Sequence, residues 1–292
     1  MVPNVFMKFG DFELFVLSDG RFRLDGGAMF GVVPKTLWQR VMPSDDRNRV
    51  TLGLNCLLIR AGKEIIVVET GTGEKFDAKR QDIFGIDHSV TLLDSLAARG
   101  VSPDDVTIVV NTHLHFDHCG WNTRFNNDGK PVPTFPRARY WVQRGEYQHA
   151  LQPTERDRAS YLNENFQPMA DSNQWLFPEG DTEIVPGVEL VRIPGHTRDM
   201  QGVRIRSAGR TAFFFADMVP TTAHLQYPWI MGYDLYPMMT LEQKKKWIPE
   251  ALKNEWLCLF AHDPNVPAAY LRERDARIVA EPFLEPELVD AR

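Results

Sequence analysis

Short apolar runs alternate with polar turns along the chain, and they predict many strands. Residues 52–60 and 64–70 predict a β-hairpin, because two strand-like runs flank a turn that contains Gly62. Residues 106–110 form a short, largely apolar run, as expected of a strand covered on both faces. Further strands are expected at residues 12–17, 139–143, 189–193, 211–216 and 257–260.

Apolar residues three or four positions apart predict helices between the strands. Residues 89–99 carry such a face, with Gly100 as the stop. Other helices are expected at residues 145–151, 155–165 and 241–253, the last with Thr240 as its N-cap. No Gly/Ser-rich linker or internal repeat divides the sequence, so we expect one domain over residues 1–292. The mixture of strands and helices predicts an α/β or α+β layered fold.

The composition narrows the class of protein only modestly. Hydrophobic residues make up 43% and charged residues 25% of the chain, which is typical of a globular protein. The net charge of −6 disfavours a nucleic-acid partner, and we read Lys244, Lys245 and Lys246 as a solvated helix face. No apolar stretch is long enough for a membrane span. Three scattered cysteines and an N-terminus without signal-peptide character predict a cytoplasmic protein.

Three of the eight histidines lie within six residues, directly after the strand expected at residues 106–110. Imidazole and carboxylate are good ligands for zinc and similar metals. On an extended chain, residues two apart point to the same side, so His113 and His115 can bind one ion together. Asp117 and His118 follow as the chain turns, and they can face a neighbouring ion. The segment therefore predicts a metal site rather than a solvated loop.

Four ligands from one segment cannot complete two metal sites, so other segments must contribute. His196, Asp217 and His262 each follow an apolar strand-like run. Residues at strand ends are held by a rigid scaffold and are well placed for site chemistry. We therefore expect these three residues to join the cluster.

The order of these residues resembles that of the metallo-β-lactamase superfamily. The pattern is His-x-His-x-Asp-His at residues 113–118, Pro-Gly-His at 194–196, an Asp after an apolar strand, and a late His. The resemblance implies a four-layer αβ/βα sandwich with two divalent metal ions, expected to be Zn²⁺, at one edge between two sheets. It implies that His113, His115 and His196 hold one ion, that Asp117, His118 and His262 hold the other, and that Asp217 bridges them.

The resemblance also implies a hydrolytic reaction. Two aspartates offset only part of the charge of two divalent ions, so a bridging water would become a hydroxide that attacks an electrophilic centre. Asp117 would carry a proton to the leaving group, and Asp217 would complete the catalytic site. His115 stands where di-iron redox relatives usually carry glutamate, which favours hydrolysis over redox chemistry.

Within the superfamily, the chain is most similar to the N-acyl homoserine lactonase and organophosphate hydrolase branch. Residues 112–122, 194–197 and 216–220 carry this similarity. The leading prediction is therefore a quorum-quenching type of lactonase or a related esterase. A phosphotriesterase or arylesterase is the first alternative, and a di-iron redox module is the second.

Two positions depart from the pattern of these relatives. Glu69 stands where many members carry an aspartate that supports the metal ligands. Pro220 stands where a well-known lactonase branch carries a tyrosine that helps to polarise the lactone. Tyr227, Tyr233 and His224 are the residues that could replace this tyrosine.

Aromatic and apolar residues near these motifs predict a pocket for a small molecule with an apolar portion. The residues singled out for substrate binding are Met29, Phe30, Phe116, Trp121, His224 and Trp229. The alternative for each apolar residue is a place in the core or at a dimer interface. For His224, the alternative is a loop histidine whose hydrogen bonds are satisfied within the protein. Related lactonases are often dimers, so a homodimer is also expected.

Overall fold

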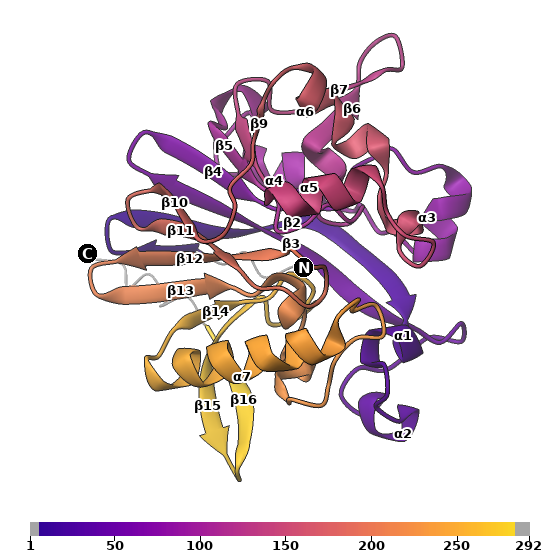
Figure 1. Cartoon of the computed structure of the whole chain (residues 1–292), viewed down its shortest axis with the longest axis vertical. Helices are drawn as coiled ribbons and strands as arrows, with labels where there is room; N and C mark the ends of the chain where they lie inside the picture. The colour runs from indigo at the N-terminus through magenta and orange to yellow at the C-terminus, as the bar shows by residue number, and fades with distance from the viewer. Residues whose placement is uncertain (1–5, 284–292) are drawn as a thin grey trace, which may run out of the picture.

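Two seven-stranded sheets dominate the computed structural model, which describes residues 6–283 (Figure 1). The first sheet contains β1 (Phe6–Phe9), β2 (Phe12–Asp25), β3 (Arg49–Ala61), β4 (Glu64–Val68), β5 (Ile108–Val110), β8 (Arg139–Trp141) and β9 (Trp175–Leu176), in this spatial order. The second contains β10 (Thr182–Val185), β11 (Val188–Arg192), β12 (Gln201–Ser207), β13 (Arg210–Phe214), β14 (Leu257–Leu259), β15 (Ala268–Arg274) and β16 (Arg277–Pro282). A small separate hairpin consists of β6 (Thr123–Phe125) and β7 (Pro131–Pro133).

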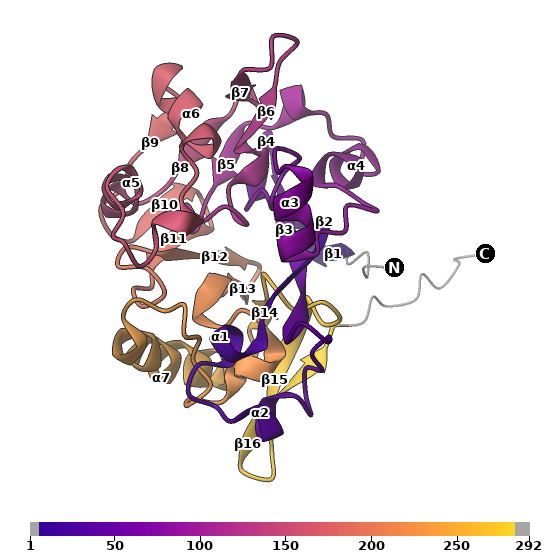
Figure 2. The same ribbon diagram turned by 90° about the vertical axis from the view of Figure 1, so that its right-hand side faces the viewer.

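Helices cover the outer faces of both sheets (Figure 2). The helices of the described residues are α1 (Gly26–Phe30), α2 (Lys35–Trp38), α3 (Ala78–Phe84), α4 (Leu92–Ala97), α5 (Arg144–Leu151), α6 (Gln167–Asp171) and α7 (Pro237–Lys253). The helices α4, α5 and α6 pack on the first sheet, and α7 packs on the second. None of the helices within residues 6–283 is long and apolar enough to cross a membrane.

Alternate residues of the central strands explain the layering. On β2, Leu14 and Val16 pack between the two sheets, whereas Phe15 and Leu17 pack beneath the helices. Successive side chains of a strand point to opposite faces, so a strand buried on both faces must be apolar almost throughout. The expected four-layer αβ/βα sandwich is confirmed. That residues 1–292 form a single domain stays a prediction.

The helix predicted over residues 155–165 is wrong. Only two short 3-10 turns occur there, Arg158–Ser160 and Asn163–Asn165. The carbonyl of Ser160 accepts a hydrogen bond from the Phe116 backbone N–H at 2.8 Å, so it serves a neighbouring loop instead of a helix. The N-cap assigned to Thr240 is also wrong, because α7 begins at Pro237, and proline is favoured in the first turn of a helix.

Backbone hydrogen bonds join the two sheets at the edge where β5 and β14 end. The Gly53 N–H on β3 donates to the carbonyl of His262 at 3.0 Å. The Gln201 N–H on β12 donates to the carbonyl of Thr112 at 3.0 Å. Each bond connects a strand of one sheet to the segment that follows a strand of the other. The loops that carry the predicted ligands are thereby held to both sheets.

Lys244 is buried, whereas Lys245 and Lys246 on α7 are exposed. The interpretation of residues 244–246 as a solvated helix face is therefore wrong for Lys244. Its side chain is fully buried, and its ammonium group donates to the carbonyls of Gln226 at 2.6 Å and Trp229 at 2.8 Å. Lys245 is half exposed and pairs with Glu242 on the helix surface. One turn of α7 is thereby fastened to residues 226–229, which lead into the next loop.

We expect Lys244→Met to lower the free energy of unfolding by about 1–3 kcal/mol, because two carbonyls lose their buried donor. Lys245→Met should change it by less than about 0.5 kcal/mol, as is usual at exposed positions. Urea unfolding of both variants measures the difference. Equal stability of the two variants would show that the buried ammonium group does not hold this loop.

Candidate metal centre

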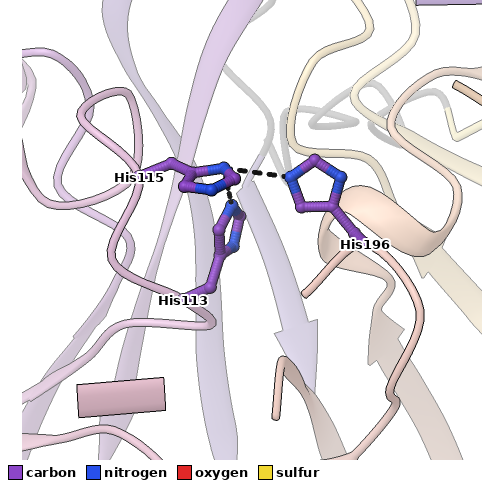
Figure 3. Close-up of side chains that lie close together, drawn as sticks. All are labelled: His113, His115 and His196. Atoms are coloured by element: carbon purple, nitrogen blue, oxygen red, sulfur yellow. Dashed lines mark hydrogen bonds between the residues drawn. The ribbon is translucent and has the colours of Figure 1, made fainter. Parts of the chain in front are cut away.

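Three histidine rings from two separate segments converge at the joined edge of the sheets (Figure 3). His113 Nε2 lies 3.1 Å and His196 Nε2 lies 3.0 Å from His115 Nδ1. All three rings are buried. Metal–nitrogen bonds of zinc place two tetrahedral ligands about 3.3 Å apart, so this spacing suits three ligands of one ion.

A second group of side chains lies beside the first. His118 Nε2 and His262 Nε2 are 3.1 Å apart, and Asp117 Oδ2 lies 3.8 Å and 3.7 Å from them, respectively. The three residues come from the end of β5 and the end of β14. Their ligand atoms lie within 4.8 Å of one another, which is compatible with a common ion.

Asp217 faces both groups, with a different oxygen toward each. Its Oδ2 lies 3.3 Å from His196 Nε2, and its Oδ1 lies 3.1 Å from His262 Nε2 and 3.5 Å from His118 Nε2. Within residues 6–283, Oδ1 is buried without a hydrogen-bond donor. A buried carboxylate oxygen in this condition is costly unless a cation meets it.

The electrostatics of the cluster favour bound cations. Burial and the neighbouring histidine rings lower the pKa of His113 and His115 well below the usual range, so both rings keep free lone pairs. Burial opposes the ionisation of Asp217, but His118, His262 and His196 hold its pKa well below the usual range. Burial opposes protonation of His118 and His196, but nearby carboxylates, Asp217 first, raise the pKa of both rings. The donor set thus combines the neutral imidazoles of His113 and His115, two rings held in a carboxylate field that favours a positive charge, and an anionic carboxylate, and these residues fit a pair of divalent ions.

Hydrogen bonds on the far side of the rings orient their ligand atoms. The carbonyl of Gly53 accepts from His262 Nδ1 at 2.9 Å, which fixes the proton there and turns the Nε2 lone pair toward the cluster. Asp234 Oδ1 lies 2.9 Å from His196 Nδ1 and acts in the same way. Asp234 was not predicted to belong to the site, because no local sequence pattern relates it to a histidine 38 positions earlier.

Glu69 occupies the position at which many relatives carry an aspartate that supports the metal ligands. Its Oε1 accepts from the Thr112 N–H at 3.0 Å, and its Oε2 lies 3.3 Å from His118 Nδ1. The second contact is close enough for an ion pair but is not aligned as a hydrogen bond. Glu69 has a left-handed backbone conformation, with φ of 64°. The longer side chain thus still reaches the ring that an aspartate would support.

Comparison with known proteins agrees with this geometry. The family described as the metallo-beta-lactamase superfamily matches residues 50–262. This chain belongs to the metallo-β-lactamase superfamily.

Individual relatives in the superfamily extend over different shares of the chain. N-acyl homoserine lactonase AiiA of Bacillus thuringiensis subsp. kurstaki is 31% identical over 183 residues, which are 59% of this chain and 62% of that protein. The chain thus matches less than two thirds of that relative's length. The crystal structure of a probable metal-dependent hydrolase from Staphylococcus aureus is 31% identical, with a TM-score of 0.86, and covers 95% of this chain and 100% of its own. AidC, a dizinc quorum-quenching lactonase, is 19% identical with a TM-score of 0.79 over 96% and 97% of the two chains, and shares the fold.

Glu146 on α5 connects the two metallo-β-lactamase motifs that supply the first group of histidines. Its buried carboxylate accepts from the Leu114 N–H at 3.0 Å, between His113 and His115. It also accepts from the Thr197 hydroxyl at 2.6 Å, directly after His196. The hydroxyl of Tyr161 donates to it at 3.0 Å. One side chain thereby positions both segments, although it is too remote in sequence to be recognised as part of the site.

A cavity of about 480 Å³ opens beside the ligands. Five of the expected ligands line it: His115, Asp117, His196, Asp217 and His262. Of the six residues singled out for substrate binding, Met29 and Phe116 line the cavity. The lining also includes Arg156, Asp157, Ala159 and Ser160, which sequence patterns did not identify because their segment was predicted to be a helix.

The structure places the other four residues away from the cavity lining. The indole of Trp121 donates to buried Asp19 at 2.6 Å in the core beneath the helices. Phe30 is fully buried and contacts the rings of both His224 and Trp229, at centroid distances of 4.7 and 5.7 Å. These residues support the fold near the site.

His224 is satisfied within the protein, as the alternative interpretation held. Its Nε2 donates to the carbonyl of Met29 at 2.9 Å, so Nδ1 accepts from the Thr221 hydroxyl at 2.8 Å. Burial lowers the pKa of His224 to about 4, which keeps the ring neutral.

We expect His113→Ala and Asp217→Ala to lose bound metal and activity together, because each removes a ligand from a buried site. The loss of metal affinity should exceed the roughly 10–100-fold that follows the loss of an outer supporting residue. Metal content after dialysis measures this, and His88→Ala, outside the cluster, is the control that should keep its metal. Full activity with stoichiometric metal in either ligand variant would contradict the assignment.

We expect Glu146→Ala to weaken metal binding about 10–100-fold, because both histidine-bearing segments lose their common acceptor. Glu146→Gln should behave much more like the wild type, since its amide oxygen keeps the Leu114 N–H and its amide nitrogen can donate to Thr197. Chelator competition measures the affinity. If both variants bound metal as tightly as the wild type, Glu146 would have no positioning role.

Proposed function

We propose that this protein is a dinuclear zinc hydrolase that opens lactones, chiefly N-acyl homoserine lactones, or cleaves related esters. The observation that carries the proposal is Asp217, whose two oxygens face two separate groups of ligands beside one cavity. The similarity to AiiA, an N-acyl homoserine lactonase, supports the substrate class. A cytoplasmic location and a homodimer stay predictions.

Two bound zinc ions supply Lewis-acid polarisation of a carbonyl oxygen and activation of a water nucleophile. Asp217 remains ionised, because the surrounding histidines hold its pKa low, and so serves as a permanent anion between the two groups. Asp117 lies at the cavity surface and still reaches His118 and His262. It is therefore the carboxylate placed to carry a proton to the leaving alkoxide.

Apolar side chains make up part of the cavity lining and suit an acyl chain. This part, the apolar wall, consists of Leu24, Met29, Phe84, Phe116, Met231 and Leu235. The rings of Phe84 and Phe116 are 4.8 Å apart, and Phe76 backs Phe116 at 5.4 Å. The cavity volume falls in the range of small-molecule sites, and burying each methylene of a chain contributes about 0.8 kcal/mol.

Position 220 is a proline, where a lactonase branch carries a tyrosine that helps to polarise the lactone. Tyr233 is our candidate to replace that tyrosine. Among Tyr227, Tyr233 and His224, only Tyr233 belongs to the cavity lining. Tyr233 is 37% exposed, but partial desolvation of its hydroxyl, with Asp25 and Asp117 nearby, raises its pKa to about 12, so the hydroxyl keeps the proton it would donate to a substrate carbonyl. Pro220 has a different task, since its carbonyl accepts from the His262 N–H at 2.9 Å.

Hydrolysis of aryl esters or aryl phosphotriesters on the same metals is the second candidate. The rings of Phe84 and Phe116 in the cavity lining favour it, because aryl substrates could stack on them.

A panel of acyl lactones, aryl esters and aryl phosphotriesters, combined with metal analysis, tests the proposal. We expect about two zinc ions per chain, loss of activity on chelation, and the highest kcat/KM for lactones. Within the lactones, kcat/KM should rise with acyl length, on the order of tenfold for each two methylenes that the apolar wall covers. Preference for phosphotriesters would support the second candidate, and redox-active iron would support a di-iron module.

Phe84→Ala provides a matched check on the chain-length effect. Phe84 lines the cavity at the end of α3, whereas neighbouring Ile83 is exposed and does not. Phe84→Ala should flatten the chain-length profile, and Ile83→Ala should leave it unchanged. A flat profile in the wild type would contradict an acyl-chain role for the apolar wall.

A further inference from the structure

Arg156 stands out among the residues that line the cavity. Within residues 6–283, it is the one lysine or arginine that lines this cavity. Within residues 6–283, its hydrogen bonding is limited to one contact, from a terminal nitrogen to the carbonyl of Gly232 at 2.7 Å. No acidic side chain of that part of the chain forms an ion pair with it. A guanidinium group carries five N–H donors, so most of them are free.

Both segments that hold Arg156 in place are themselves anchored. Next to it, Asp157 accepts from the Thr154 hydroxyl at 2.6 Å and contacts His149 Nε2 at 2.5 Å. On the other side of the contact, the Gly232 N–H donates to the carbonyl of Ala28 at 2.8 Å. Arg156 therefore joins residues 154–160 to residues 231–235, two segments that both line the cavity, and this one hydrogen bond orients its exposed side chain.

The charge around Arg156 selects the kind of group it would bind. The carboxylate of Asp157 lines the same cavity, but its two oxygens are already engaged by Thr154 and His149. Asp157 therefore places a negative charge next in the sequence to Arg156 and forms no ion pair with it within residues 6–283. Such a place favours a neutral acceptor, such as an amide carbonyl oxygen, over a full anion.

We propose that Arg156 is a specificity-determining residue that donates to the amide carbonyl of an N-acylamino lactone; this rests on the proposed function. The three parts of such a substrate match three parts of the cavity. In the proposed complex the lactone carbonyl would face the metal ligands, the amide carbonyl would face Arg156, and the acyl chain would face the apolar wall, all of which line the same cavity. A lactone without the amide would leave the guanidinium group without its acceptor.

The test compares two lactones with tails of equal length, an N-decanoyl homoserine lactone and an alkyl lactone that lacks the amide. Arg156→Met should lower kcat/KM for the first about 10–100-fold, through KM, because a charge-assisted hydrogen bond is lost. For the second, kcat/KM should change less than twofold. Arg156→Lys should restore part of the loss. Arg158→Met, exposed on the same segment and outside the cavity lining, is the control and should match the wild type.

The outcomes separate this inference from the proposed function. Equal losses on both lactones, a fall in kcat alone, or no loss on either would overturn the role of Arg156 while leaving the lactonase in place. A larger effect on a lactone that carries a carboxylate in place of the amide would overturn the choice of a neutral acceptor. If the wild-type protein opened neither lactone, the proposed function and the role of Arg156 would both be overturned.

Discussion

The contact of the Asp217 carboxylate with histidines from both groups links the metal site to the packing of the two sheets. Asp217 follows β13 of the second sheet, whereas His118 follows β5 of the first. The contact can form only when both sheets are packed and their edges are joined, as the bond between Gly53 and His262 joins them. An ion that binds there recognises the assembled sandwich and not either sheet alone. Metal binding should therefore add directly to the stability of the fold.

The sequence was informative wherever the evidence is local. Strand periodicity placed β3, β4 and β5, and the spacing of residues 113–118 was enough to mark the cluster, because both signals lie within a few residues. The helix expected at residues 155–165 failed for the opposite reason. Its local composition allows a helix, but the Ser160 carbonyl is taken by Phe116, a residue more than forty positions away in the sequence. No sequence pattern near residue 160 predicts that contact.

The supporting residues show the same limit. Glu146 and Asp234 act on the histidines through contacts that only the folded chain creates. Lys244 was read with its two neighbours, although successive helix positions point in different directions and only one of the three enters the core. Trp121 and Phe116 are five positions apart in one motif, yet one turns to Asp19 and the other to the cavity. Proximity to a motif predicts the neighbourhood of a side chain but not its direction.

The division between strand-end residues and cavity-lining segments has a consequence for how such a protein can change. The metal-facing residues come from the ends of strands, whereas α1, α3 and residues 154–160 and 231–235 supply much of the enclosure. Grafting different lengths or compositions into these surface segments would reshape the recognised molecule while the reactive centre stayed intact. Surface segments can thus vary while the candidate metal site is retained. This makes the protein a practical starting point for directed evolution of new substrate preferences.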